Sequence, residues 1–525
     1  MFRPRLIYYS DAHHFHAKRL EPPLSRHKLN WPVDELVGTG VDLLVFGLGY
    51  GDAYFHDTKI GRIVGDEKEV WDTLIDWRIM RMVEEARRLG TDQLRAVVER
   101  GRELGLKVFP SLKLQDGAEP EAERCGWVKW KHGREVCLNE KDDRHPGFEF
   151  AYDFANNLVR QDKLAILREA LEDYGVDGIE LDFMFFPAYF RKSEVESNIP
   201  LMNDFVSQVR ALTREVGQKQ GRDIPVCARV HHRRDENLKI GLDVESWLNR
   251  KHVDLVVAQT SDTLFDTGID VRWLSDAANS AGAAAYLRPA LRVYDERSGW
   301  PVIENYRALG QTLLEQGMAG MYLGYLPWPF SETEYQILRE VSHPDAHGRS
   351  SKRYLLQPRE GQGTFTAPPE RHLPAPLRAG KTIRLPIRVN DDLDGAREEG
   401  EMRSPQLTIR FADLCIEDRF SIRFNETDLP VADAEVTDER ATRIPVSLRT
   451  DVDAPLVFAG HWFRYSLDVD LLRRGENVLE IDVTHLDSRA SWERSVNGVE
   501  IRTRYKDFER PRGIEDVERV KPLSP

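Results

Sequence analysis

Eight short apolar runs, rich in branched side chains, recur along the first 330 residues, and segments of helical period separate them. The runs cover residues 6–10, 43–47, 107–112, 178–183, 225–231, 253–259, 284–289 and 320–325. Between them apolar residues recur at helical spacing, as at Leu94, Val97 and Val98 behind a Thr91 N-cap. Eight such repeats are expected to close on themselves. The alternation therefore predicts an α/β fold that begins with a (β/α)8 TIM barrel.

Helix ends agree with this division of the chain. Gly105 and Gly175 are expected to end the helices before the third and fourth strands, and Ser331 with Glu334 forms a capping box that opens the eighth helix. A doubly wound open sheet is the competing architecture. The glycine-rich phosphate loops of that fold, G-x-G-x-x-G and G-x-x-x-x-G-K-[ST], do not follow the first run, which favours the barrel.

Helical period fades after Asp345, and short β-type runs take its place. They cover residues 382–389, 407–411, 420–425, 463–469, 478–483 and 499–505. We therefore expect two domains: a barrel at 1–345 and an all-β, jelly-roll-like sandwich at 346–525, with a linker at about 346–378. A chain of 525 residues with 41% hydrophobic content is long enough for two cores.

Charge and hydropathy exclude several classes of partner. The 88 acidic and 74 basic residues give a net charge of −14, which argues against a duplex nucleic-acid binder. No apolar run approaches the roughly 18 residues that a membrane-spanning helix needs. The start MFRPRLIYYSD shows no signal-peptide core, so we expect a cytoplasmic location, or a periplasmic or secreted one if a signal peptide has been removed.

Polar residues directly after the barrel strands are the candidates for an active site, because TIM-barrel enzymes place it at the carboxyl ends of the strands. Glu180 and Asp182 stand out. Residues two apart on a strand face the same side, so both carboxylates are expected to point into the lumen, where charge is costly unless it is used or paired. The alternative is an ion pair with Arg229 or Lys113 that only organises the barrel.

The stretch 152–187, YDFANNLVRQDKLAILREALEDYGVDGIELDFMFFP, resembles the barrels of glycosyl-hydrolase-like family ten. In that family a D-x-x-N-P-x-V-R helix precedes a strand of the type V-D-G-I-H-L-D-Y-x-R-Y-P. The resemblance implies a glycoside-hydrolase barrel in which Asp182 is the strand-four carboxylate. Glu180 replaces the usual histidine and Phe185 the usual arginine, so substrate and mechanism are expected to differ from those of the typical member.

The leading hypothesis is hydrolysis of a glycosidic bond in an oligo- or polysaccharide, with Asp182 as nucleophile or stabiliser, Asp262 as general acid and Glu180 orienting a hydroxyl or sharing the proton. Asp182 and Asp262 fill the two carboxylate places of α-galactosidase-type barrels, which these positions resemble. In chitinase-type barrels the acid glutamate stands where Met184 stands here. Glu236, Asp295 and Glu296 are alternatives to Asp262.

Substrate binding is expected at further strand ends, and neither a cofactor nor a metal is part of this hypothesis. The expected residues are Asp11, His13, Tyr50, Asp52, Lys113, Arg229, His231, Gln259, Arg288 and Trp328. The cations among them, with Arg292, indicate a substrate carrying carboxylate or sulfate, or else ion pairs with lumen carboxylates. A group of aromatic side chains is a further candidate for stacking on sugar rings, although each alone is more often a core residue: Phe183, Phe185, Phe186, Tyr189, Phe190, Trp127, Trp130 and Trp328.

Two other functions stay open. His14 and His16 form H-x-H after the first strand, and His231 or His232 follows the fifth, which is a pattern of a metal-dependent hydrolase. A barrel that has lost an acid would instead be a noncatalytic carbohydrate-binding protein.

The second domain carries two motifs of its own. Its run GENVLEIDV resembles the G-x-N-x-L-x-I-x-V ending of galactose-binding-like modules, which implies sugar binding or simple packing on the barrel. The acidic stretch at 391–401 is either a calcium loop or a solvated loop.

Overall fold

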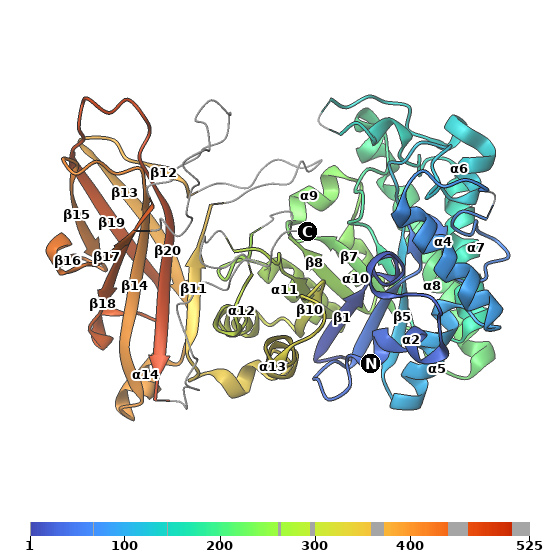
Figure 1. Ribbon diagram of the computed structural model, residues 1–525, viewed down its shortest axis with the longest axis horizontal. Coiled ribbons are helices and arrows are strands. Elements are labelled where there is room, and N and C mark those ends of the chain that lie inside the picture. The colour runs from blue at the N-terminus through green and yellow to red at the C-terminus, as the bar shows by residue number, and fades with distance from the viewer. Residues whose placement is uncertain are drawn as a thin grey trace.

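The computed structural model describes residues 2–66, 68–143, 145–260, 264–293, 300–358, 372–438 and 460–506. Eight parallel strands close in the order β1-β10-β9-β8-β7-β6-β5-β2 and form the right-hand body in Figure 1. They are β1 (Leu6–Ser10), β2 (Leu43–Gly47), β5 (Lys107–Lys113), β6 (Ile179–Asp182), β7 (Val226–His231), β8 (Leu255–Gln259), β9 (Ala284–Arg288) and β10 (Gly320–Gly324). The predicted barrel is confirmed.

Helices surround the barrel, and a hairpin of β3 (Gly49–Tyr50) and β4 (Ala53–Tyr54) follows β2. Gly105 and Gly175 end α5 and α7 in left-handed conformation, and the capping box of Ser331 and Glu334 opens α13, as predicted. The Thr91 cap is wrong by one residue, because Asp92 accepts the Arg95 amide at 2.8 Å and begins α5. The helices are α1 (Ala12–His14), α2 (Arg26–Leu29), α3 (Trp31–Asp34), α4 (Leu74–Arg88), α5 (Gln93–Leu104), α6 (Trp127–His132), α7 (Asn157–Tyr174), α8 (Val195–Gln220), α9 (Arg234–Lys239), α10 (Val244–Asn249), α11 (Arg272–Ala281), α12 (Ile303–Glu315) and α13 (Glu332–Glu340).

The barrel interior is apolar toward the amino ends of the strands and polar toward their carboxyl ends. Every second residue of a strand points inward, and the lower inward positions form one buried cluster that includes Ile7, Val45, Phe109 and Val257. The same alternation carries the upper inward positions to the carboxyl ends of the strands. We call that end, from the last inward residue of each strand upward, the barrel mouth.

The second domain is a sandwich of two antiparallel sheets, which confirms the predicted fold class (Figure 1, left). One sheet has the order β11-β20-β14-β18-β17, with β12 beside β20, and the other has the order β13-β19-β15-β16. The strands are β11 (Lys352–Leu356), β12 (Ala375–Pro376), β13 (Lys381–Val389), β14 (Met402–Ala412), β15 (Arg419–Phe424), β16 (Thr427–Leu429), β17 (Glu435–Asp438), β18 (Gly460–Ser466), β19 (Gly475–His485) and β20 (Ser495–Tyr505). Their inner faces share one buried core.

The G-x-N-x-L-x-I-x-V motif is strand β19, and its residues have structural roles. Leu479, Ile481 and Val483 point into the sandwich core. The Asn477 amide donates to the carbonyl of Arg473 at 2.8 Å, and its oxygen accepts from the amide of Asn425 at 2.8 Å. The asparagine thus fastens the turn before β19 to the strand beside it.

The sandwich docks on the barrel through β11, which lies against α12 (Figure 1). The Thr267 hydroxyl and the backbone of Leu355 exchange hydrogen bonds at 3.2 and 2.8 Å, and the amide of Asn390 donates to the Thr312 hydroxyl at 2.9 Å. Strand β11 falls inside the stretch 346–378 that the sequence predicts as a linker. It is a sheet strand because it pairs with β20 on one side and covers α12 on the other.

The acidic stretch at 391–401 contacts cations of the chain. Asp391 is fully buried, lies 3.3 Å from the Lys352 ammonium and accepts from the hydroxyls of Tyr354 and Tyr505. Arg349 pairs with Asp392, Glu399 and Glu401 around α14 (Leu393–Glu398). Arginine and lysine thus neutralise several of these carboxylates, while Asp392, Asp394 and Glu399 remain largely exposed to solvent.

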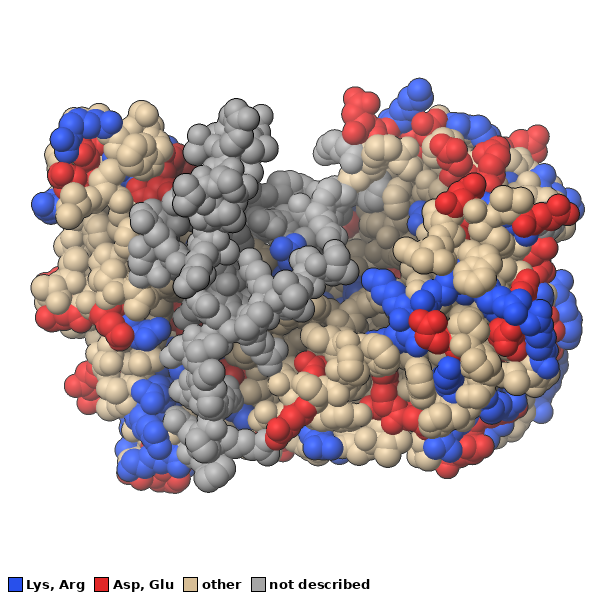
Figure 2. Space-filling model, viewed as in Figure 1, with Lys and Arg blue, Asp and Glu red and all other residues tan. Residues whose placement is uncertain are grey.

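Acidic and basic side chains are interspersed over the visible face of the barrel domain (Figure 2). In the described parts of the chain, no helix combines the length and the hydropathy needed to cross a membrane.

Replacing the buried carboxylate of the sandwich tests its structural role. Asp391→Asn removes the buried carboxylate that lies 3.3 Å from the Lys352 ammonium and accepts from two tyrosine hydroxyls, so the sandwich should lose about 3 kcal/mol of stability. Differential scanning calorimetry would show its unfolding transition at lower temperature. Asp394→Asn is the matched control, because this carboxylate is 82% exposed and pairs with Arg397 at the surface. An equal shift in both variants would contradict the expectation.

Candidate active site

Arg229 lies at the centre of the charged groups inside the barrel. Its guanidinium contacts the Asp182 carboxylate, lies 3.4 Å from Glu180 and donates to the side-chain oxygen of Gln259 at 3.3 Å. It also lies over the rings of Tyr9 and Tyr322, at 4.8 and 5.5 Å from their centroids. Strand register places Arg229 beside Asp182, so the contact follows from the sheet itself. The ion pair left open by the sequence is present for both carboxylates.

Asp182 is held at both oxygens. One contacts Arg229, and the other accepts the backbone amide of Met184 at 2.8 Å. The side chain is only 2% exposed. Its orientation is therefore fixed before any ligand arrives, as a reacting carboxylate requires.

Glu180 lies one layer deeper and is fully buried. The Ser111 hydroxyl donates to it at 2.7 Å and the Tyr322 hydroxyl at 3.1 Å. Burial raises the pKa of Glu180; the Arg229 charge opposes this shift and the nearby Asp182 charge adds to it. The surroundings of Glu180 thus shift its equilibrium toward the protonated form.

A second ion pair lies at the barrel mouth next to the first, because strand register places Lys113 beside Asp182. The Lys113 ammonium lies 3.1 Å from Asp11, which also accepts the Tyr325 hydroxyl at 3.1 Å. Burial alone would raise the pKa of Asp11, but the charge of Lys113, the neighbouring His14 and His13 and the hydrogen bond from Lys113 together hold the pKa below its usual value. Gly47 leaves room for this carboxylate, since a Cβ there would lie 3.3 Å from it.

Tyr325 adopts a left-handed backbone conformation, with φ of 56°. Such a conformation costs a bulky residue on the order of 1–3 kcal/mol and occurs mainly where the surroundings impose it. Here it accompanies the bond from the tyrosine hydroxyl to Asp11.

Aromatic rings border these charges. His13 stacks on Tyr50 with centroids 4.4 Å apart, and Lys113 lies 4.4 Å from the ring centre of Phe185, which is 40% exposed. Arg288 lies over the ring of Tyr325 at 5.5 Å. Several expected substrate-binding residues therefore lie together at the barrel mouth: Asp11, His13, Tyr50, Lys113, Arg229, Gln259 and Arg288.

Three other expected residues have different surroundings. Asp52 belongs to a separate buried cluster, where it pairs with Lys163 at 2.6 Å and accepts from Tyr54 and Tyr152. His231 is buried at the end of β7, accepts the Arg233 amide at 3.0 Å, and has no hydrogen-bond partner at Nε2 among the described residues. Trp328 is 44% exposed and carries the Arg19 guanidinium on its face.

The predicted general acid, Asp262, lies outside the described residues, as do its alternatives Asp295 and Glu296. The remaining alternative, Glu236, is buried and pairs with Arg233 and Lys239 within its own helical turn, both at 2.8 Å.

Sequence reasoning missed Tyr9, Ser111 and Tyr322, which contact the charged groups from inside the barrel. A signal for them existed. Tyr9 lies two residues before Asp11 and Ser111 two before Lys113, so the alternation that selects the strand ends also selects them.

The histidines after β1 point in different directions. His16 is fully buried, stacks on Phe55 at 4.2 Å and bonds to the carbonyl of Ala12, whereas His14 lies against Tyr325. Within the described ranges, no three His, Cys, Asp or Glu residues are grouped as a metal site would require.

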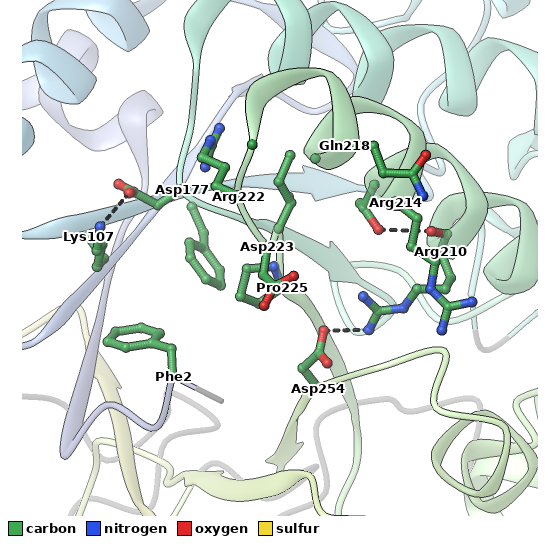
Figure 3. A pocket seen from close by; sticks show the side chains of 15 residues that line it. Phe2, Lys107, Asp177, Arg210, Arg214, Gln218, Arg222, Asp223, Pro225 and Asp254 are labelled. Carbon is green, nitrogen blue, oxygen red and sulfur yellow. Dashed lines mark hydrogen bonds and ion pairs between the residues drawn. The ribbon is translucent and has the colours of Figure 1, made fainter.

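A hollow of about 860 Å³ opens at the other end of the barrel, near the amino ends of the strands (Figure 3). Two of its acids are paired, Asp177 with Lys107 at 2.8 Å and Asp254 with Arg210. These pairs connect neighbouring segments at the amino ends of the strands, whereas Asp182 lies at the carboxyl ends.

Acidification should lower the free energy of unfolding through His16, which is buried in its neutral form. Burial lowers the pKa of His16 from 6.5 to about 4, so its contribution to stability is present above pH 6.5 and is lost as the pH falls toward 4. Between about pH 7 and about pH 5, wild type should lose about 2 kcal/mol more than His16→Phe. Melting temperatures at both pH values measure this, with exposed His27→Phe as control. Equal losses in wild type and His16→Phe would refute it.

No family model matches the chain, and no curated protein matches it. Among solved structures, a maltogenic α-amylase from Thermotoga neapolitana is similar over 90% of this chain and 98% of its own, with 12% identity and a TM-score of 0.38. An α-L-fucosidase from Paenibacillus thiaminolyticus is similar over 91% of this chain and 96% of its own, with 13% identity and a TM-score of 0.35. A cycloisomaltooligosaccharide glucanotransferase from Paenibacillus sp. covers 94% of this chain, which spans 57% of that one, at 10% identity and a TM-score of 0.34. Likenesses of this size carry no argument about activity.

Proposed function

We propose that the chain is a glycoside hydrolase that cleaves a glycosidic bond at the barrel mouth. The observation that carries the proposal is the fixed Asp182 carboxylate, held by Arg229 and the Met184 amide at the carboxyl end of the barrel. Rings and hydrogen-bonding groups border the same opening, as a bound sugar requires. The family resemblance of the stretch 152–187 supports the same assignment for Asp182.

Asp182 acts as nucleophile or as stabiliser of the positive charge that develops on the anomeric carbon. The pair with Arg229 suits this role, because it orients the carboxylate and leaves its remaining lone pairs for the substrate. Glu180, which lies below Asp182 and has a raised pKa, orients a sugar hydroxyl or shares the proton in this proposal.

Asp262 is the general acid in this proposal. It follows β8, whose last residue Gln259 already bonds to Arg229, and β8 lies two strands from β6 in the barrel order. A two-carboxylate mechanism needs an acid in addition to Asp182, and we assign that role to Asp262.

We further propose that the substrate of this hydrolase is anionic. Lys113 and Arg229 are neutralised by Asp11 and Asp182, so they are not available as counter-charges for a ligand. Arg288 borders the mouth and has no ion pair with a residue of the described ranges; we assign it to a carboxylate or sulfate of the sugar.

The deep burial of Asp182 favours one other function. A carboxylate 2% exposed and paired with arginine also suits a barrel that binds carbohydrate without cleaving it. The two functions differ in turnover, so one experiment separates them.

That experiment is reducing-sugar release from a panel of neutral and anionic oligosaccharides. Asp182→Asn should lower turnover at least about 10²-fold, the scale for removal of a catalytic group, with little change in binding. Asp254→Asn is the matched control, since it breaks another aspartate–arginine pair at the opposite end of the barrel. Binding without turnover in wild type would identify the noncatalytic protein. Loss of turnover after EDTA treatment would identify the metal-dependent hydrolase.

A chemical rescue separates a reacting carboxylate from a structural one. In Asp182→Ala, added azide can attack the anomeric carbon in place of the carboxylate as the bond to the leaving oxygen breaks. If Asp182 is the nucleophile, azide should restore turnover and yield a glycosyl azide, detectable by mass spectrometry. Folding of each variant is checked by circular dichroism. Absence of rescue in a folded variant would limit Asp182 to charge stabilisation.

A further inference from the structure

A hollow of about 500 Å³ lies on the outer side of the barrel domain, between α6, the first turns of α7 and the segment 59–61. Its lining contains none of the charged residues of the barrel mouth. Three large apolar side chains of its lining are exposed to solvent: Ile60 at 43%, Trp127 at 39% and Leu158 at 47%. Trp130, which stacks on Trp127 next to the hollow, is 40% exposed. Apolar groups gathered at one place on a surface mark a binding site more often than isolated ones do.

The two tryptophans form a prepared surface. Their rings stack with centroids 5.3 Å apart and planes 29° from parallel. They stand three residues apart on α6 and so share one face of that helix. The opposite face is anchored, because Val128 is buried and the Lys129 ammonium donates to the carbonyls of Asp116 and Ala118 at 2.8 and 3.2 Å. Exposure of the rings is therefore imposed by the fold.

Polar groups converge on the same hollow. Gln161 and Asp162 line it from α7, and Lys131 and His132 line it from α6. The Asp162 side chain is 11% exposed, and its nearest cation, the Lys163 ammonium, lies 3.7 Å away. Burial raises the pKa of Asp162 to about 6, with the Lys163 charge opposing the shift. A deeply placed carboxylate with one distant partner retains free acceptor sites.

The combination of exposed apolar side chains and recessed polar groups indicates which kind of ligand fits the hollow. A lipid surface would cover the apolar side chains but leave the recessed carboxylate and amide unpaired, which is costly. A pyranose ring has an apolar C–H face for the tryptophan and a rim of hydroxyls for Asp162, Gln161 and Lys131. The hollow also opens at the same end of the barrel as the mouth, because α6 follows β5 and α7 begins there.

We infer that this hollow, with Trp127 and Trp130 at its edge, is a second carbohydrate site that holds a pyranose unit of a polysaccharide outside the barrel mouth. The inference takes its ligand class from the proposed function. A long chain bound here stays close to the mouth while its other units enter or leave it, so the site raises the local concentration of substrate. Short oligosaccharides that occupy only the mouth do not need it.

Native gel electrophoresis through embedded polysaccharide tests the site without requiring turnover. The probes are a neutral glucan, a xylan, a galactan, a chitin derivative and an alginate, each run against the full chain. At least one should retard wild type, and Trp127→Ala should weaken that binding about tenfold, whereas Trp127→Tyr retains most of it. Trp77→Ala is the matched control, since this tryptophan is 45% exposed on α4.

The outcomes separate this inference from the proposed function. Equal retardation of wild type and Trp127→Ala, or retardation by none of the probes, overturns the second site. Asp182→Asn should bind the retarding polysaccharide as wild type does. If wild type cleaves oligosaccharides while Trp127→Ala binds normally, the second site is wrong and the hydrolase stands. If Trp127→Ala loses binding but no sugar is cleaved, the site stands and the hydrolase is wrong.

Discussion

The buried guanidinium of Arg229 is the group on which the interior of the barrel depends. Two carboxylates, one amide oxygen and two tyrosine rings from four strands surround it. A carboxylate in a dry lumen costs several kcal/mol without a counter-charge, and two adjacent carboxylates cost more. With Arg229 in place the strands can carry Glu180 and Asp182 toward the lumen, and the chain has charged groups where a packed barrel would otherwise hold only apolar ones.

The same arginine makes the two carboxylates unequal. Glu180 lies deeper, between Ser111, Cys227 and Tyr322, and burial favours its protonated form. Asp182 lies one layer higher, in contact with the guanidinium and with a backbone amide. Carboxyl groups with different surroundings take different roles in acid–base chemistry. The alternation of the strand therefore places one carboxylate deep among hydroxyl groups and the other higher, against the guanidinium and a backbone amide.

Periodicity in the sequence is enough to predict the barrel, the sandwich and the inward direction of Glu180 and Asp182, because each follows from local geometry. It also predicts the helix ends at Gly105 and Gly175. The surroundings of Asp52 and Asp391 could not be predicted, since Lys163 and Lys352 reach them from distant parts of the chain. The linker was misjudged for the same reason: β11 is a strand only because β20, about 140 residues later, pairs with it.

Docking of the sandwich on α12 links the two domains through buried contacts, not through a free tether. Ala308 on α12 belongs to the core of the sandwich, and Asn390 bonds to Thr312 on the next turn of the same helix. Helix α12 precedes β10, the strand that supplies Tyr322 to Glu180 and leads to Tyr325 on Asp11. A helix that carries both domains has little freedom to shift, so the sandwich helps to fix the strand whose tyrosines complete the charged lumen. On this argument the sandwich contributes to the site through rigidity, even where it touches no substrate.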